Sequence, residues 1–190
     1  KVPGGSSSIS GHLYVRGQSI DFDHWAELGN QGWSYKEVLP YFIKSEDRST
    51  GKDAYHGVGG PQHVSGVLER HPLCELFVQG AQDLGVRSNP DYNGESQEGV
   101  SYYQRTILNG RRHSAATAFL DPIRNRANLR IITGALVERL TFEGKQVKGV
   151  VFQKNQRTEE VRAGKEILLS AGSINFLKFT SFPERGMPNF

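Results

Sequence analysis

Histidine and serine are the residue types in this chain that could support acid–base or nucleophilic chemistry or bind a metal. The six histidines are His12, His24, His56, His63, His71 and His113. No two of them have the close pairing on one helix face that defines a zinc-protease site, and a single cysteine, Cys74, excludes a multi-cysteine zinc site. Three serines at positions 6–8 precede the first histidine, but the Gly-x-Ser-x-Gly turn of many hydrolases is missing. The sequence therefore predicts no metal site and no hydrolase chemistry.

Two segments of small residues could let the backbone approach a ligand closely. Gly4, Gly5 and the serines at 6–8 form a turn that no bulky side chain blocks, so it could cradle a phosphate or ribose. An ordinary flexible loop has the same composition. The apolar run 166–170 leads into the small residues 171–173, a pattern that lets the chain turn beneath a bound cofactor. Neither segment alone decides between ligand contact and a plain turn.

The composition is that of a loop-rich globular protein, with 36% hydrophobic and 23% charged residues. The 23 Lys and Arg and the 20 Asp and Glu give a net charge of +3, and the longest basic run is the pair Arg111-Arg112. A surface that binds nucleic acid needs clustered positive charge, so that class is disfavoured. No stretch approaches the roughly 20 apolar residues that a membrane-spanning helix needs. With 190 residues, the chain can bury the core of one large domain or of two small ones.

The first helix signals lie in residues 21–45. The spacing of apolar residues predicts a short helix over 21–28, which Gly29 ends. Ser34 and Glu37 then form a capping-box pattern, and Pro40 is expected to divide the helix that follows into two short pieces.

Two further helices are expected later in the chain. Pro72 suits a first helical position, and the apolar residues that follow it fall on one face before Gly85 ends the helix. Cys74 lies in this pattern and is expected to be a small buried hydrophobe. Ser114 is expected to cap another helix, which Pro122 limits.

Strands dominate the expected structure after residue 128. β-prone residues and the turn residues between them predict strands at 63–65, 99–108, 129–133, 136–142, 147–153, 158–163 and 166–170. Short polar links, such as 143–145, favour an antiparallel meander over the later ones.

The order and spacing of short motifs resemble the glucose–methanol–choline oxidoreductases, and most closely their choline-dehydrogenase-like bacterial branch. The resemblance covers residues 1 to about 175. The motifs that carry it are Gly4-Gly5-Ser6-Ser7-Ser8-Ile9, Tyr14-Val15-Arg16-Gly17, Asp21-Phe22-Asp23, Trp33-Ser34-Tyr35, Val38-Leu39-Pro40-Tyr41-Phe42, Tyr55-His56-Gly57, Gly59-Gly60-Pro61, Asp91-Tyr92-Asn93-Gly94, Asn109-Gly110-Arg111 and Ser114-Ala115-Ala116.

This resemblance implies FAD as the cofactor and the oxidation of a small-molecule alcohol by hydride transfer to the flavin. In such enzymes the glycine–serine loop lies along the flavin. The positions that match its contacts here are Ser6, Ser10, Gly11, His12 and Leu13. Val137, in the segment Ala135-Leu136-Val137, matches the residue whose backbone meets the adenine.

The chain departs from the family pattern at several places. Pro3 stands where an aliphatic residue is usual, Ser10 stands where Asn or His is usual, and the match stops after Asn175. The Gly-x-Gly-x-x-Gly fingerprint of the family would precede Lys1, and its catalytic histidine would lie far beyond Phe190. The resemblance therefore implies that this chain contains no catalytic residue and is inactive alone.

The expected fold class is α/β with an α+β insertion. Residues 1–33 and 127–175 are expected to belong to a Rossmann-like FAD-binding domain with an antiparallel β-meander, residues 34–126 to a substrate domain, and residues 176–190 to a divergent tail. The alternative function is a flavin-free, non-catalytic interaction or scaffold module derived from the same fold.

Overall fold

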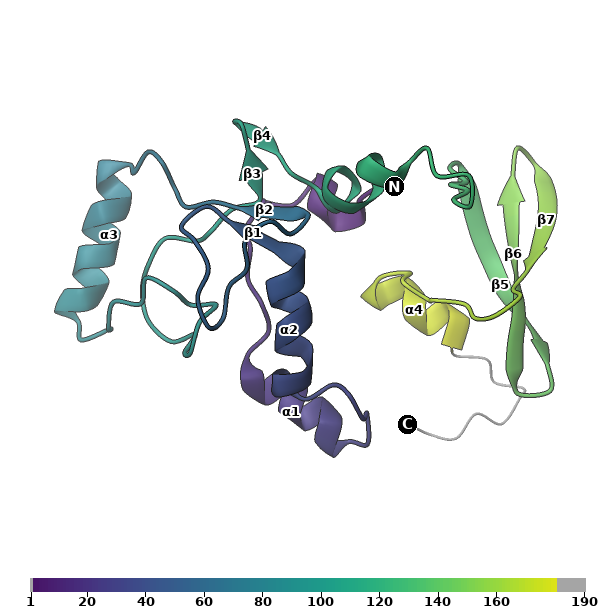
Figure 1. Cartoon of the computed structure of the whole chain (residues 1–190), viewed down its shortest axis with the longest axis horizontal. Coiled ribbons are helices and arrows are strands. Elements are labelled where there is room, and N and C mark those ends of the chain that lie inside the picture. Colours follow the sequence, from purple (N-terminus) through teal and green to yellow (C-terminus); the bar gives the residue numbers. More distant parts are fainter. Residues whose placement is uncertain (1, 181–190) are drawn as a thin grey trace. The chain divides into compact units, whose positions relative to one another are not determined.

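A computed structural model describes residues 2–180. The chain divides into two compact units, Lys1–Leu129 and Arg130–Phe190. Figure 1 shows that helices, short strands and long loops build the first unit, whereas the second contains three longer strands and one helix. None of the helices in the described chain combines the length and the apolar character that crossing a membrane requires.

Two helices with capping boxes form the first packed element of unit 1. Helix α1 (Ser19–Glu27) begins at Gln18, whose amide donates to Asp21 Oδ2 at 2.9 Å, and it ends before Gly29, which has a φ of 96°. Left-handed φ values favour glycine because they cost a Cβ-bearing residue energy. The helix predicted over 21–28 is therefore confirmed, although it begins two residues earlier and ends one residue earlier.

Helix α2 (Tyr35–Ser45) runs through Pro40 without a break, so the predicted division into two pieces is wrong. Its predicted capping box is present, with the Ser34 amide donating to Glu37 Oε2 at 3.1 Å. A proline inside a helix removes one backbone hydrogen bond. Packing offsets that loss, because the ring of Phe42, half a turn beyond Pro40, meets Phe22 of α1 at 5.6 Å. Tertiary packing therefore outweighs the low helix propensity of proline at this position.

A short parallel strand pair follows α2. Strands β1 (Glu46–Arg48) and β2 (Gln62–Val64) place Asp47 opposite His63. The predicted strand at 63–65 corresponds to β2, whereas β1 was not predicted, because three charged residues carry no strand pattern. Val64 and Glu46 are fully buried in this pair.

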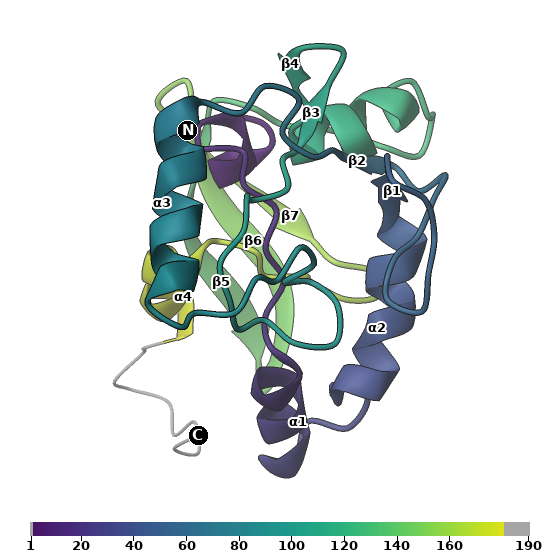
Figure 2. The ribbon, with the colours of Figure 1, turned by 90° about the vertical axis from the view of Figure 1, so that its left-hand side faces the viewer.

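Helix α3 (Pro72–Asp83) confirms the prediction made from Pro72 and Gly85. The His71 side chain caps it by accepting from the Leu73 amide at 3.2 Å. Figures 1 and 2 show that α3 stands apart from α1 and α2. Three of its large apolar residues and the one that follows it are 67–87% exposed, namely Leu73, Leu76, Phe77 and Leu84. Cys74 is exposed as well, so its predicted burial is wrong.

The segment 99–108 forms a regular strand only at its end, which largely corrects the prediction. Strand β3 (Ile107–Leu108) pairs with β4 (Arg111–Arg112) across an Asn-Gly turn with positive φ at both residues. Arg105 forms isolated antiparallel bridges with Leu13 and Ser65. Most of this segment is therefore extended backbone that connects other loops.

Ser114 begins a helical segment, as predicted, although the helix is wider than an α-helix. Its Oγ accepts from the Thr117 amide at 3.3 Å, and its carbonyl accepts from Ala118 at 2.8 Å. The π-helical turn η2 (Ala116–Leu120) passes into the 3₁₀ turn η3 (Asp121–Ile123), which contains Pro122.

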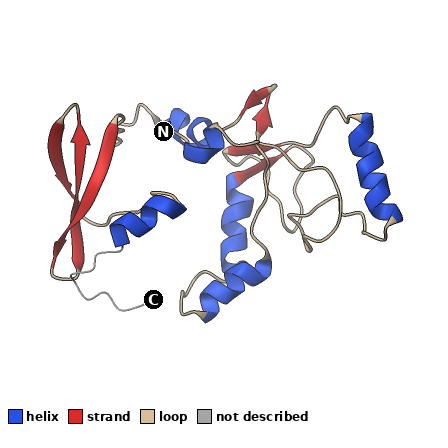
Figure 3. Ribbon diagram, turned by 180° about the vertical axis from the view of Figure 1, so that it is seen from behind, coloured by secondary structure: helices blue, strands red, loops and turns tan. Residues whose placement is uncertain are grey.

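Unit 2 contains the predicted antiparallel meander. Strands β5 (Ala135–Glu143), β6 (Gln146–Lys154) and β7 (Arg157–Arg162) lie in the order β5-β6-β7, and Figure 3 shows them as one sheet. Val151 and Phe152 of β6 are buried. Helix α4 (Ser173–Thr180) follows.

The strands predicted at 129–133 and 166–170 are wrong, since neither range has strand structure. Both runs are apolar and β-prone, but a strand also needs a partner for its backbone groups, and none of the described residues pairs with them. The predicted tail at 176–190 falls partly outside the described residues. The observed fold is mixed α/β with a three-stranded antiparallel sheet, the coarser part of the predicted fold class.

Candidate cofactor-binding site

The glycine–serine loop forms a tight turn that only glycine can begin. Gly4 has a φ of 87°, and a Cβ there would lie 2.5 Å from Ser8 Oγ and 3.1 Å from the Ala116 amide nitrogen. The 3₁₀ turn η1 (Gly5–Ser8) follows, and the Ser10 amide donates to the Ser6 carbonyl at 2.8 Å. The loop therefore has a defined backbone, and the flexible-loop alternative does not describe it.

The start of the loop is fastened to the segment that precedes η2. Ser7 Oγ accepts from the Ala115 amide at 2.9 Å and donates to the Gly4 carbonyl at 2.5 Å. Arg112 donates to the Ser7 carbonyl at 3.1 Å. Two motifs separated by about 100 residues in the sequence thus form one structural element.

The end of the loop is held by the extended segment before β3. The His12 carbonyl accepts from the Thr106 amide at 2.8 Å, Leu13 forms a bridge with Arg105, and the Tyr14 amide donates to the Gln104 carbonyl at 2.9 Å. Because both ends are fixed, the residues between them present a constant surface.

The structure brings five of the six predicted cofactor contacts together in this loop. Ser6, Ser10, Gly11 and Leu13 are exposed, and His12 is half-buried with a φ of 52°. Within residues 2–180, the hydroxyls of Ser6 and Ser10 form no hydrogen bond. These side chains are therefore available to a ligand.

Val137, the sixth predicted contact, lies in β5 of unit 2. It pairs with Phe152 of β6, and the next pair is Arg139 with Val151, so that Glu138 is an extra residue in a β-bulge. Bulges redirect side chains at the edge of a sheet. The adenine contact assigned to Val137 stays a prediction.

The electrostatic field at the loop is positive. Partial burial, and then the charges of Arg112 and Arg105, lower the pKa of His12 below its ordinary value of 6.5. The neutral ring is therefore favoured at pH 7, and it can both donate and accept one hydrogen bond. The same two arginines would attract an anionic ligand.

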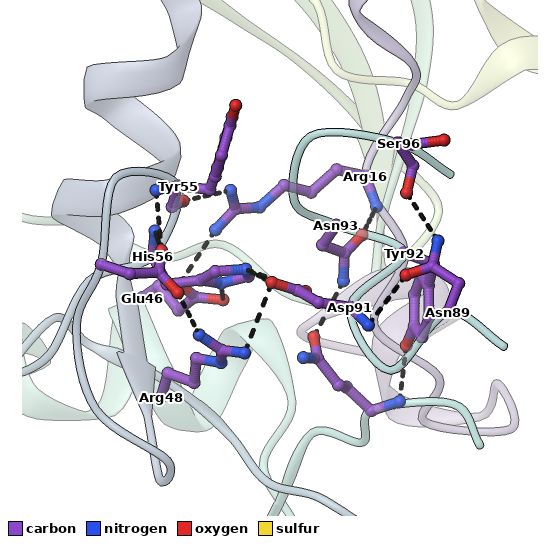
Figure 4. Close-up of polar contacts among 12 residues, drawn as sticks. Arg16, Glu46, Arg48, Tyr55, His56, Asn89, Asp91, Tyr92, Asn93 and Ser96 are labelled. Carbon is purple, nitrogen blue, oxygen red and sulfur yellow. Dashed lines mark hydrogen bonds and ion pairs between the residues drawn. The ribbon is translucent and has the colours of Figure 1, made fainter. Parts of the chain in front are cut away.

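Directly after the loop, residues 14–16 meet a buried polar network that sequence reasoning missed (Figure 4). Arg16, Glu46 and His56 are 5%, 0% and 1% exposed. Arg16 Nη2 lies 2.9 Å from Glu46 Oε2, an ion pair whose angles fall outside those of a hydrogen bond, while Arg16 Nη1 donates to the Tyr55 carbonyl at 2.7 Å.

His56 connects two carboxylates in this network. Its Nδ1 lies 3.0 Å from Glu46 Oε2, and its Nε2 lies 3.0 Å from Asp91 Oδ2. Each ring nitrogen therefore lies within hydrogen-bond distance of a carboxylate oxygen. Burial would raise the pKa of Glu46, but hydrogen bonds from His56 and the Gly57 amide and the charge of Arg16 outweigh it and hold that pKa below 4.5.

The segment that carries Asp91 clamps the backbone after the loop. Asn93 accepts from the Arg16 amide at 2.8 Å and donates to the Tyr14 carbonyl at 3.0 Å. The Tyr92 hydroxyl donates to the same carbonyl at 2.9 Å. The chain after the glycine–serine loop is therefore held at both its amide and its carbonyl groups.

Oxygen and nitrogen atoms of Asp53, His56 and Asp91 lie within 4.8 Å of one another, a separation that a metal ion could bridge. The guanidinium of Arg48 already balances these carboxylates, at 2.6 Å from Asp53 and 3.5 Å from Asp91. The cluster is an ion-pair network that needs no further cation.

One sequence signal could have found the network. The motifs Tyr14 to Gly17, Tyr55 to Gly57 and Asp91 to Gly94 were separate pieces of the family pattern, and the structure brings them together. A buried polar cluster is the physical reason why these three motifs contain Arg, His, Asp and Asn rather than apolar residues.

Comparison with known proteins places these features in a family. A sequence model described as GMC oxidoreductase matches residues 1–177. The oxygen-dependent choline dehydrogenase of Brucella anthropi is 42% identical over 175 residues, which make up 92% of this chain and 32% of that protein. The chain thus spans about a third of the length of the curated relatives it matches.

Solved structures agree with this assignment. An FAD-dependent oxidoreductase from Chaetomium thermophilum superposes with a TM-score of 0.84 at 31% identity, over 92% of this chain and 33% of that one. Pyridoxine 4-oxidase from Mesorbium loti gives a TM-score of 0.77 at 36% identity, over 83% of this chain and 31% of that one.

Proposed function

Because the chain belongs to the GMC oxidoreductase family, we propose that the polypeptide carrying it binds FAD and oxidises a small-molecule alcohol by hydride transfer to the flavin. The observation that carries the proposal is the 42% identity to a choline dehydrogenase over 92% of this chain. A solved relative, the FAD-dependent oxidoreductase from Chaetomium thermophilum, supports FAD as the cofactor.

The loop at residues 4–13 has the properties that such a cofactor requires. A Cβ at Gly5 would meet no atom within 4 Å, and one at Gly11 would meet only Leu13 Cγ at 3.9 Å, so the backbone there is open to close approach. The exposed hydroxyls of Ser6 and Ser10 can donate or accept. The charges of Arg105 and Arg112 suit the diphosphate of FAD, which is anionic.

Each proposed contact has a physical role. Ser6 and Ser10 would hydrogen-bond polar edges of the cofactor, Gly11 would let the backbone approach it, and the neutral ring of His12 would add a donor or acceptor. Leu13 would cover apolar ring surface and shield it from water. Bound FAD would supply the hydride acceptor.

We assign no catalytic residue to this chain, and we propose that the group taking the alcohol proton lies outside it. We further propose that residues 1–33 and 127–175 belong to a Rossmann-like FAD-binding domain and residues 34–126 to a substrate domain. The division between the two compact units, at 129/130, lies close to the proposed boundary at 126/127 and supports it.

The experiment uses the longer polypeptide, extended at both ends to the length of the relatives. It should purify with the visible absorbance of flavin, and that absorbance should bleach when choline, pyridoxine or another primary alcohol is added without oxygen. A flavin-free protein would instead indicate the scaffold alternative, and a flavoprotein that no alcohol reduces would refute the proposed reaction.

The 190-residue chain provides the matched control. It contains no Gly-x-Gly-x-x-Gly fingerprint, so it lacks the charge-assisted hydrogen bonds of roughly 1.5–3 kcal/mol each that such a turn gives a diphosphate. Calorimetric titration with FAD should show weak binding or none. Submicromolar affinity would show that the loop at 4–13 carries far more of the binding than we propose.

A further inference from the structure

Residues 14–16, which follow the loop proposed to contact the cofactor, are held by two separate sets of contacts, which we call clamps. The first acts on the Arg16 guanidinium, through Glu46 at 2.9 Å and the Tyr55 carbonyl at 2.7 Å. The second acts on the backbone, through Asn93 on the Arg16 amide and on the Tyr14 carbonyl.

His56 joins these two clamps. Its Nδ1 holds Glu46 of the first clamp, and its Nε2 holds Asp91, which lies two residues before Asn93 of the second. The ring is 1% exposed, and Figure 4 shows it between the two carboxylates. Its own amide donates to Asp53 at 2.9 Å, so its backbone is fixed as well.

We propose that His56 is a positioning residue for the cofactor loop, which sets the place of residues 10–13 against FAD by joining the two clamps on residues 14–16. The inference rests on the proposed function. His56 touches neither the loop nor, on this proposal, the flavin, and it acts through Arg16 and Asn93.

The chemistry of the site explains why histidine is needed. The buried carboxylate of Glu46 and the half-buried carboxylate of Asp91 lie at opposite ends of the ring, and an imidazole places one nitrogen at each end of a single rigid plane. A glutamine at position 56 has a donor at only one end, and its carbonyl oxygen would face a carboxylate at the other. One clamp should therefore remain and the other should loosen.

The test compares His56→Gln with His63→Gln as a matched control. His63 also pairs with a carboxylate, Asp47 at 2.9 Å, but within residues 2–180 no hydrogen bond or ion pair joins its side chain to residues 14–16. In the longer polypeptide, His56→Gln should weaken FAD binding by about tenfold, the loss of one charge-assisted hydrogen bond, whereas His63→Gln should leave it unchanged. In the 190-residue chain, hydrogen exchange at the Arg16 amide, which donates to Asn93, should accelerate in His56→Gln alone.

Each outcome separates the inference from the proposed function. A wild-type polypeptide that binds no FAD refutes the proposed function, whatever the variants do. A wild type that binds FAD, with His56→Gln equal to His63→Gln in affinity and exchange, overturns the positioning role. If His56→Gln does not fold, Arg16→Lys, which keeps the charge but cannot reach both Glu46 and the Tyr55 carbonyl, carries the same prediction and the same refutation.

Discussion

Gly57→Ala is the substitution for which the structure gives the clearest expected loss of stability. A Cβ at Gly57 would lie 1.8 Å from the Ile43 carbonyl oxygen and 2.8 Å from its carbon, and contacts under 3.0 Å essentially never occur for real Cβ atoms. The oxygen would have to move by about 1.2 Å (3.0 − 1.8). It belongs to the last turn of α2, where it also accepts the Glu46 amide.

The cost has two parts. Overpacking a tight site typically costs about 1–3 kcal/mol. The displaced loop would also weaken the hydrogen bond from the Gly57 amide to Glu46 Oε2 at 3.0 Å, whose acceptor is charged and buried, a loss of roughly 1.5–3 kcal/mol. We therefore expect a total of about 2.5–6 kcal/mol, a large part of the roughly 5–15 kcal/mol by which a domain is stable.

Gly66→Ala is the matched control. A Cβ at Gly66 would meet no atom within 4 Å, and its φ is not left-handed. Its effect on stability should stay within about 0.5 kcal/mol or be slightly favourable, because alanine reduces the entropy of the unfolded chain.

Urea unfolding followed by tryptophan fluorescence measures both variants. The two tryptophans, Trp25 and Trp33, lie in unit 1 with ring centroids 5.6 Å apart, so the signal reports the unit that contains both glycines. If Gly57→Ala unfolded at the same urea concentration as Gly66→Ala, the close packing of residues 57–60 on the end of α2 would be refuted.

The other predictions concern pH, a helix and the cofactor. The folded pKa of Glu46 is lowered, so its contribution to stability is present above its ordinary pKa of 4.5 and is lost as pH falls through the folded value. The urea midpoint should therefore drop between about pH 5 and pH 3. The Glu46→Gln variant should be less stable at neutral pH and show a smaller drop, and an equal drop in both proteins would contradict this role of Glu46. Gly80→Ala, on a helical residue with open space around it, should stabilise α3 by up to about 1 kcal/mol, measured by hydrogen exchange of α3 amides; faster exchange would contradict this. In the longer polypeptide, Val137→Ile should retain flavin and Val137→Pro should not, because proline removes an amide from β5; equal retention in two folded variants would refute the backbone role. Ser10→Asn should tighten FAD binding by up to about tenfold, since a longer amide replaces a short hydroxyl, and an unchanged or weaker dissociation constant would remove Ser10 from the contacts.

The sequence predicted those elements whose signals are local. The capping box at Ser34, the first-turn Pro72 and the turn at Gly144 each act within a few residues, and each gave a helix or a hairpin where expected. Predictions that depended on a distant partner failed. The runs at 129–133 and 166–170 are β-prone, yet a strand forms only where another strand completes its hydrogen bonds.

The candidate site shows the same division. The contacts proposed for the loop at 6–13 came from a resemblance that could be matched residue by residue. The network around His56 was not predicted, because Arg16, Glu46, His56 and Asp91 are up to 75 residues apart (91 − 16) and no local pattern links them; only the family motifs that contain Arg16, His56 and Asp91 indicated it. A charged residue read from sequence is normally expected at the surface, and only its partners reveal that it is buried.

Some residues of the loop stabilise the fold and others are proposed to contact the cofactor, so the two roles can be tested separately. Three groups hold the loop in place: Gly4 allows the tight turn, Ser7 Oγ accepts from the Ala115 amide, and the His12 carbonyl accepts from the Thr106 amide. The hydroxyls of Ser6 and Ser10 form no hydrogen bond within residues 2–180. A side chain that stabilises the fold should change unfolding and cofactor binding together, whereas a side chain that only faces the cofactor should change binding alone. Ser7→Ala should therefore lower the free energy of unfolding of the 190-residue chain by roughly 1 kcal/mol, because hydrogen bonds are lost, and its urea midpoint should fall. Ser6→Ala should leave that midpoint unchanged and weaken FAD binding in the longer polypeptide.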